Sequence, residues 1–182
     1  MRDVLTRNRV IGLLIALAIF LVDQAVKAWV SGPLQLQQRG VIDVLPFFDL
    51  RWIENRGVSL GMLQATSDTM RWGLVIVTFL IAAGVTVWLL RERVMGEILG
   101  LSLILGGALG NIRDRYLYGY VIDYADFHIG EWRPFMVFNI ADAAISIGVV
   151  IILLRAFFVK DGSDPQPIGA GDTAPDTNRT LS

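Results

Sequence analysis

Four long apolar segments divide the chain into blocks of membrane-spanning length. The first carries no charge from residue 10 to 22 and continues past Asp23 and Lys27, and the fourth contains a single charge, Asp142. The second and third are uncharged throughout. Because a helix needs roughly 20 residues to cross the apolar core of a bilayer, the pattern predicts transmembrane helices at about residues 10–29, 72–90, 97–113 and 137–155.

Arginines around these segments predict the orientation of the protein. Three lie among the first nine residues and two in the short link at 91–97, whereas the long loops at 31–71 and 113–136 hold fewer for their length. Because cytoplasmic loops are enriched in Lys and Arg, we expect both termini in the cytoplasm and both long loops outside. A cleaved signal peptide is the alternative for the first segment, but the sequence DQAVKAW that follows offers no small-residue cleavage motif.

Composition agrees with a membrane protein and removes several kinds of chemistry. Hydrophobic residues make up 54% of the 182 residues and charged residues 18%, with a mean hydropathy of +0.55, which is too apolar for an ordinary soluble domain. The net charge of −1 gives no reason to expect a nucleic-acid partner. The chain has no cysteine and one histidine, His128, so thiolate chemistry and multi-histidine metal sites are excluded, and we expect no metal or cofactor.

The first outer loop, residues 31–71, has the composition of a folded unit. Its segment VIDVLPFFDLRWIE is rich in β-branched and aromatic residues in partial alternation, which favours short strands on the membrane surface over an irregular loop with interfacial aromatics. Residues 161–182 are rich in Pro, Gly, Ser, Thr and Asp and predict a disordered cytoplasmic tail. We therefore expect one membrane domain, residues 1–160, that is mainly α-helical with a small extracytoplasmic sheet.

Ionisable residues at membrane depth are the main candidates for function, because charge is costly there. Asp23 and Lys27 are spaced i, i+4 and share a helix face, where they form either an interfacial pair or a structural or substrate contact. Asn55 and Gly57 precede the second helix. Asn55 fits a helix cap and a hydrogen bond to a substrate backbone equally well.

A denser polar group ends the third apolar segment. Gly110 permits close packing of a neighbouring helix, and Asn111 and Arg115 share a face, with Asp114 between them in the sequence. A polar helix end that meets water is the alternative interpretation. Beyond this group, Gly119 predicts a turn, and the next residues predict a short strand that ends at Asp123.

Asp123 and Asp142 are the two carboxylates best placed to act together. Asp142 lies in the first turn of the fourth predicted helix, where it can also serve simply as a helix-capping residue. The residues between the two can loop outward and return, so both carboxylates can meet at the outer membrane surface. Two carboxylates that share one proton can act as general base and general acid on a water, as in aspartic proteases. Asp126 and Glu131 are competing carboxylates in the same loop, but we expect both to be solvated loop charges.

Two other functions are compatible with a membrane protein of this kind. A proton- or ion-coupled transporter would use Asp142 and Asp23 as relay groups, but it predicts carboxylates near the bilayer midplane and broken helices. A non-catalytic scaffold would use the aspartates only to cap helices. The positions of the acids near helix ends favour the peptidase.

At these residues the chain resembles the lipoprotein signal peptidases, also called signal peptidase II, which are bacterial aspartyl proteases. Four motifs in order carry the resemblance: DQAVK at 23–27, ENRGVSLGML at 54–63, GGALGNIRDRYLYGYVID at 106–123 and FNIADAAI at 138–145. It spans about residues 10–155. It implies four transmembrane helices, a β-cradle within residues 31–71 and a surface helix within residues 113–136.

The resemblance also implies the chemistry. Asp123 and Asp142 would be the catalytic dyad, and the matching positions that line or support the site are Asp23, Lys27, Asn55, Gly57, Gly110, Asn111, Asp114, Arg115, Asn139 and Ala141. The substrates would be diacylglyceryl-modified prolipoproteins, cleaved just before the lipidated cysteine at the outer face of the bacterial inner membrane. Peptides such as globomycin would inhibit the enzyme. We expect a monomer surrounded by membrane lipids.

Overall fold

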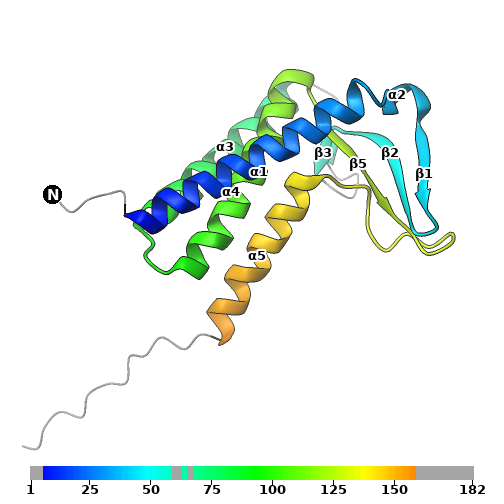
Figure 1. Cartoon of the computed structure of the whole chain (residues 1–182). Coiled ribbons are helices and arrows are strands. Elements are labelled where there is room, and N and C mark those ends of the chain that lie inside the picture. Colours follow the sequence, from blue (N-terminus) through cyan, green and yellow to red (C-terminus); the bar gives the residue numbers. More distant parts are fainter. Residues whose placement is uncertain (1–5, 59–62, 65–67, 159–182) are drawn as a thin grey trace, which may run out of the picture.

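Four long helices form the body of the protein, and a small sheet lies at one end of them (Figure 1). The computed structural model describes residues 6–58, 63–64 and 68–158, so the predicted tail at 161–182 and part of the segment VSLGML lie outside the described residues. The helices are α1 (Arg7–Ser31), α3 (Asp68–Arg91), α4 (Met95–Tyr118) and α5 (Ile140–Phe158). All four are long and apolar enough to cross a membrane, as the sequence pattern predicts.

The helix α4 is longer than its apolar segment. The prediction ended it at residue 113, but it continues through Asp114 and Arg115 to Tyr118 and ends at Gly119, which adopts a left-handed conformation with φ +84°. The extension exists because neighbouring elements supply partners for its polar side chains; Asp114 itself is fully buried. Gly119 confirms the predicted turn, since a left-handed C-terminal residue favours glycine.

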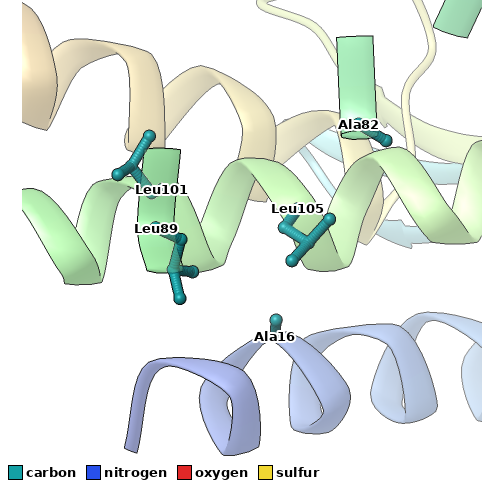
Figure 2. Close-up of a cluster of buried hydrophobic side chains, with 5 residues drawn as sticks. All are labelled: Ala16, Ala82, Leu89, Leu101 and Leu105. Atoms are coloured by element: carbon teal, nitrogen blue, oxygen red, sulfur yellow. The ribbon is translucent and has the colours of Figure 1, made fainter. Parts of the chain in front are cut away.

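The other three long helices all pack against α4. Small residues make this packing possible: a Cβ atom on Gly106 would lie 2.5 Å from the carbonyl oxygen of Ala16 on α1. Figure 2 shows the apolar core at this contact, in which Ala16 of α1 faces Leu105 of α4. The remaining core side chains are Ala82 and Leu89 of α3 and Leu101 of α4. Because α4 is central, residues on its different faces can meet α1, α3 or α5.

The sheet is antiparallel and has the order β1 (Val41–Leu45), β2 (Phe48–Asn55), β5 (Val121–Phe127). A two-stranded sheet of β3 (Gly57–Val58) and β4 (Leu63–Gln64) follows β2. The predicted strands in the first outer loop are therefore confirmed. The third strand, however, comes from the second outer loop, so two segments distant in sequence build one sheet.

Two details of the second outer loop differ from the predictions. The strand does not end at Asp123 but continues to Phe127, because it pairs along its length with β2, with Ile53 opposite Asp123 and Asp49 opposite Asp126. The surface helix expected within residues 113–136 is also wrong: beyond the end of α4, this region holds β5 and turns. Among the described residues, the short helix is α2 (Leu36–Arg39), which lies in the first outer loop between α1 and β1.

Candidate active site

Asp123 lies within β5 and is 2% exposed. Two sets of backbone contacts fix its position. The amide of Ile122 donates to Asp114 Oδ2 at 3.3 Å, which ties the start of β5 to α4. The amide of Phe138 donates to the carbonyl of Ala125 at 3.0 Å, and the amide of Ala125 donates back to Phe138 at 2.8 Å. This bridge brings the residues that begin α5 alongside the strand that carries Asp123.

Asp142 does cap helix α5. The amide of Asp142 donates to Asn139 Oδ1 at 2.9 Å, and the amide of Asn139 donates to Asp142 Oδ2 at 3.3 Å. This reciprocal pair is a capping box, in which two backbone N–H groups at a helix start are satisfied together. The prediction that Asp142 can cap a helix is thus confirmed, but capping uses only its Oδ2 atom.

Two asparagines connect the carboxylates of Asp123 and Asp142. The Nδ2 group of Asn139 donates to Asp123 Oδ1 at 2.6 Å, while the same residue caps α5 together with Asp142. The Nδ2 group of Asn111 donates to Asp142 Oδ1 at 2.8 Å, and Asn111 Oδ1 lies 3.4 Å from Asn139 Nδ2. The structure therefore brings the two aspartates of the sequence prediction into one hydrogen-bonded cluster.

Asn55 completes the surroundings of Asp123. It lies at the end of β2, and its Nδ2 group donates to Asp123 Oδ2 at 3.0 Å. Its own Oδ1 accepts the backbone amide of Gly57 at 3.2 Å, which fixes the direction in which the amide group points. Asn55 is therefore not a helix cap, and its side-chain donor faces a carboxylate.

The environment of Asp123 favours its protonated form. Burial, and then the neighbouring charge of Asp142, raise the pKa of Asp123 to about 7. Hydrogen bonds from Asn55 and Asn139 and the charge of Lys27 act in the opposite direction, since they stabilise the carboxylate. At neutral pH this side chain can hold or release a proton, which is the property required of a general acid or base.

Removing the hydrogen bond from Asn55 should move the pH dependence of the reaction. In Asn55→Ala, the Asp123 carboxylate loses a donor that stabilises its charge, so its pKa rises further. The alkaline limb of the kcat/KM profile should therefore shift to higher pH, by up to about one unit. Kinetics of the purified variant between pH 5 and 9 would check this. A limb that stays in place or moves toward acid would contradict the role given to Asn55.

A buried ion cluster supports the site from α1. Lys27 Nζ lies 2.9 Å from Asp23 Oδ2 and 2.7 Å from Asp114 Oδ2, and all three side chains are no more than 2% exposed. Lys27 also donates to Asn111 Oδ1 at 3.3 Å. The predicted i, i+4 pair is therefore present, but it is buried between helices and not interfacial. Because Asn111 in turn donates to Asp142, the lysine helps to orient an active-site amide.

Asp23 also holds the start of α5 directly. Its Oδ1 accepts the backbone amide of Ala141 at 3.0 Å. Gly110 makes this approach possible, since a Cβ atom there would lie 2.5 Å from Asp23 Oδ2 and 3.4 Å from the Cβ of Ala141. The predicted supporting residues Asp23, Gly110 and Ala141 thus meet at one point, where α1, α4 and α5 converge.

The close approach at Gly110 predicts a selective effect of small substitutions. In Gly110→Ala, the new methyl group would push Asp23 away from Ala141, and we expect a loss of about 1–3 kcal/mol in unfolding free energy together with reduced activity. Gly73→Ala on α3 is the matched control, because nothing lies within 4 Å of its added Cβ atom. Thermal unfolding in detergent would compare them. Equal melting temperatures for the two variants would contradict this packing.

Arg115 lies one turn beyond Asn111 on α4 and interacts electrostatically with Asp142, Asp123 and Asp114. Its Nε is buried and has no hydrogen-bond partner within the described part of the chain. Its carbonyl accepts Arg71 Nε at 2.9 Å, which joins the end of α4 to the start of α3. The guanidinium charge therefore acts on both carboxylates of the candidate pair.

Of the competing carboxylates, Asp126 is not a solvated loop charge as expected. It is fully buried, and its Oδ2 lies 2.9 Å from Arg51 Nε and 3.1 Å from Arg133 Nε. Since it is three residues from Asp123 on one strand, the two side chains point to opposite faces of the sheet. Glu131 is exposed, as expected. Neither belongs to the cluster around Asp123.

Gln24 is a supporting residue that the sequence interpretation missed. Its Nε2 lies 3.0 Å from Asp23 Oδ2, 3.1 Å from Asp114 Oδ1 and 3.3 Å from the carbonyl oxygen of Gly110. The available signal was an uncharged polar side chain inside an apolar segment, next to Asp23. Such a residue usually faces protein and not lipid.

These observations define a class of protein. Four membrane-length helices, and two carboxylates joined by amide side chains beside the extramembrane sheet, are the parts of a membrane-embedded aspartic peptidase. Among the described residues, no group of three or more acidic or histidine side chains could hold a metal ion.

Comparison with known proteins identifies the family. The sequence profile of signal peptidase (SPase) II matches residues 15–158. Lipoprotein signal peptidases of Rhizorhabdus wittichii and Sphingopyxis alaskensis are each 51% identical to the chain, covering 91% and 82% of it and 96% and 87% of their own lengths. Two solved structures of bacterial membrane enzymes superpose with TM-scores of 0.71 and 0.69 at 27% and 28% identity, covering 88% and 82% of this chain and 94% of each of theirs.

The chain therefore belongs to the signal peptidase II family and is a multi-pass membrane peptidase of the aspartic class. This assignment excludes the transporter and scaffold alternatives as the primary function.

Proposed function

We propose that this protein removes the signal peptide from diacylglyceryl-modified prolipoproteins and that Asp123 and Asp142 perform the hydrolysis. One observation carries the assignment of the two residues: Asn139 donates to Asp123 Oδ1 at 2.6 Å and, through its backbone and side chain, caps α5 together with Asp142. A single residue thereby fixes the position of both carboxylates. Membership of the signal peptidase II family supports the reaction.

In this mechanism Asp142 is the base and Asp123 the acid. Asp142, whose Oδ1 accepts a hydrogen bond from Asn111, takes a proton from a water whose oxygen attacks the scissile carbonyl carbon. Asp123, whose pKa of about 7 lets it retain a proton, gives that proton to the carbonyl oxygen. The tetrahedral diol then collapses: one hydroxyl proton returns to the Asp123 carboxylate, and the proton on Asp142 passes to the departing amine.

Arg115 has a positioning role in this proposal. Its guanidinium interacts electrostatically with Asp142 and Asp123, and a guanidinium forms strong hydrogen bonds with substrate oxygens. It would hold a carbonyl oxygen of the substrate backbone next to the dyad. Globomycin-like peptides would inhibit by occupying the same donors and carboxylates, and a single chain holds every residue invoked, so a monomer suffices.

The lipid on the substrate explains why the site lies where it does. Asp142 is in the first turn of α5, at the end of the helix nearest the sheet (Figure 1). A peptide bond next to a diacylglyceryl-cysteine would reach this level while its acyl chains stay in the bilayer beside the helices. Cleavage would therefore fall just before the lipidated cysteine, and its amine would become the new N-terminus.

A reconstituted cleavage assay tests this function. Purified protein in proteoliposomes would be given one precursor in two forms, with and without the diacylglyceryl group on its cysteine. We expect cleavage of the modified form alone, with the modified cysteine as the first residue of the product by mass spectrometry. Equal cleavage of both forms, or a product that begins elsewhere, would overturn the proposal.

The orientation proposed for the protein places the sheet and the dyad on the outer face of a bacterial inner membrane and the termini in the cytoplasm. The arginine distribution supports it. Because the chain has no cysteine, Asp43→Cys on β1 and Arg93→Cys between α3 and α4 would each present a single thiol. A membrane-impermeant maleimide should label the first and not the second in intact spheroplasts. The reverse labelling would contradict the orientation.

A further inference from the structure

A groove of about 620 Å³ lies between α1, α3 and α4, away from the dyad. Its walls are almost entirely apolar: Leu13, Leu17 and Phe20 come from α1, and Val75 and Phe79 come from α3. The volume falls within the range of about 300–1,000 Å³ that small-molecule sites occupy. All of the lining belongs to helices of membrane-spanning length.

The groove is separate from the active site because it uses the opposite face of α4. Leu105, Leu109 and Ile112 line it at spacings of i, i+4 and i+7, so they share one face of the helix. Gly107 meets Ala141 of α5 and lies two residues from Leu105 and Leu109, which places it on the other face. Helix α4 itself therefore stands between the groove and Asp142.

The contacts of α1 with α3 show how the groove forms. At the start of α1, Arg9 Nε donates to the carbonyl of Glu92 at 2.9 Å and Arg9 Nη2 donates to the carbonyl of Arg91 at 3.0 Å. Farther along both helices, toward the sheet, the lining residues of α1 and α3 face each other across the groove floor formed by α4. The two helices are thus joined directly at one end, and the apolar groove lies between them toward the other end.

Cationic and aromatic side chains lie at the sheet end of the groove. Arg113 lines it, is exposed, and donates to Gln24 Oε1. Tyr116 also lines it and packs edge-on against Trp72, with ring centroids 5.8 Å apart. Arg71 lies over the same Trp72 ring at 5.3 Å. Aromatic residues and arginines at this level are typical of the zone of lipid headgroups.

We propose that this groove binds one acyl chain of an anionic membrane phospholipid whose phosphate contacts Arg113. Two features select this occupant. First, an apolar groove on membrane-spanning helices does not hold water stably. A lipid tail that fills it makes dispersion contacts with its walls. Second, none of the described residues that line it is acidic, and the positive charge of Arg113 at its mouth favours a headgroup that carries a net negative charge.

Native mass spectrometry of the purified full chain tests the site, with phosphatidylglycerol and phosphatidylcholine as titrated probes. Wild type should retain one phosphatidylglycerol more tightly than phosphatidylcholine. Arg113→Gln should bind phosphatidylglycerol about tenfold more weakly, as expected for the loss of one charged hydrogen bond, while Arg113→Lys should keep most of the preference. An unchanged preference in Arg113→Gln would overturn the proposal.

A second pair of variants tests whether the acyl chain lies in the groove. Leu109→Trp fills the groove, and Leu99→Trp is its control, since both leucines lie on α4 and are 37% exposed but only Leu109 lines the groove. We expect Leu109→Trp to lose the retained lipid and Leu99→Trp to bind it as wild type does. Equal binding by the two variants would contradict the location.

Phospholipid binding in the groove does not depend on the proposed peptidase chemistry. Asp142→Asn should bind phosphatidylglycerol as wild type does, because the dyad lies across α4. If the diacylglyceryl-modified precursor displaces phosphatidylglycerol from Asp142→Asn, the groove holds the lipid of the substrate, and the proposal of a separate phospholipid site is wrong.

Discussion

Asp142→Asn should reduce kcat for prolipoprotein cleavage by about 10³-fold or more, and Asp123→Asn should do the same. An amide in place of Asp142 cannot take a proton from water. An amide in place of Asp123 has no ionisable proton to give to the carbonyl oxygen. Because the two groups act together in one step, the double variant should be scarcely slower than either single one.

Asp126→Asn is the matched control for this loss. Asp126 lies on the same strand as Asp123 and is also buried, but it faces Arg51 and Arg133. Its replacement should lower the melting temperature while leaving the kcat of the folded enzyme close to wild type. Full activity in either dyad variant, or a comparable loss of kcat in Asp126→Asn, would contradict the assignment.

Lys27→Met should be the most destabilising single change in the helices. It removes the cation between Asp23 and Asp114, which lie 2.9 and 2.7 Å from Lys27 Nζ and are fully buried. Two carboxylates are then left without their counter-ion, and the expected loss is about 3–5 kcal/mol of unfolding free energy. Activity should fall as well, because Asp23 positions Ala141 and Lys27 donates to Asn111.

The control for Lys27→Met is an ion pair of the same kind in a more exposed place. Arg155 Nε lies 3.1 Å from Glu97 Oε1, with the side chains 26% and 21% exposed, so Arg155→Met should cost about 1 kcal/mol or less. Denaturant titration in mixed micelles would measure both changes. Similar losses in the two variants would show that burial does not set the strength of the Lys27 cluster.

Much of the fold is predictable because membrane helices follow from local sequence. The four apolar segments, the strands of the first outer loop and the Asp23–Lys27 pair depend on composition and on spacing within one element. The carboxylate pair was also predictable, since a chain with no cysteine and one histidine offers few other groups for hydrolysis. The roles of the individual residues remain predictions.

Several features that the sequence did not predict depend on partners from distant segments. The strand β5 runs beyond Asp123 because β2 pairs with it, and Asp126 is buried because Arg51 comes from that neighbouring strand. Likewise, Asn55 binds Asp123 across 68 positions of sequence. No local pattern specifies such contacts, so single-sequence reasoning assigned Asp126 to solvent and left Asn55 open.

The pH dependence of kcat/KM for the wild-type enzyme tests most directly whether the two carboxylates share one proton. At low pH both are protonated and there is no base; above the raised pKa of Asp123, about 7, both are ionised and there is no acid. The profile measured in proteoliposomes should therefore be bell-shaped and fall as the pH rises above about 7. A rate that stays level or keeps rising from pH 7 to 9 would contradict the account.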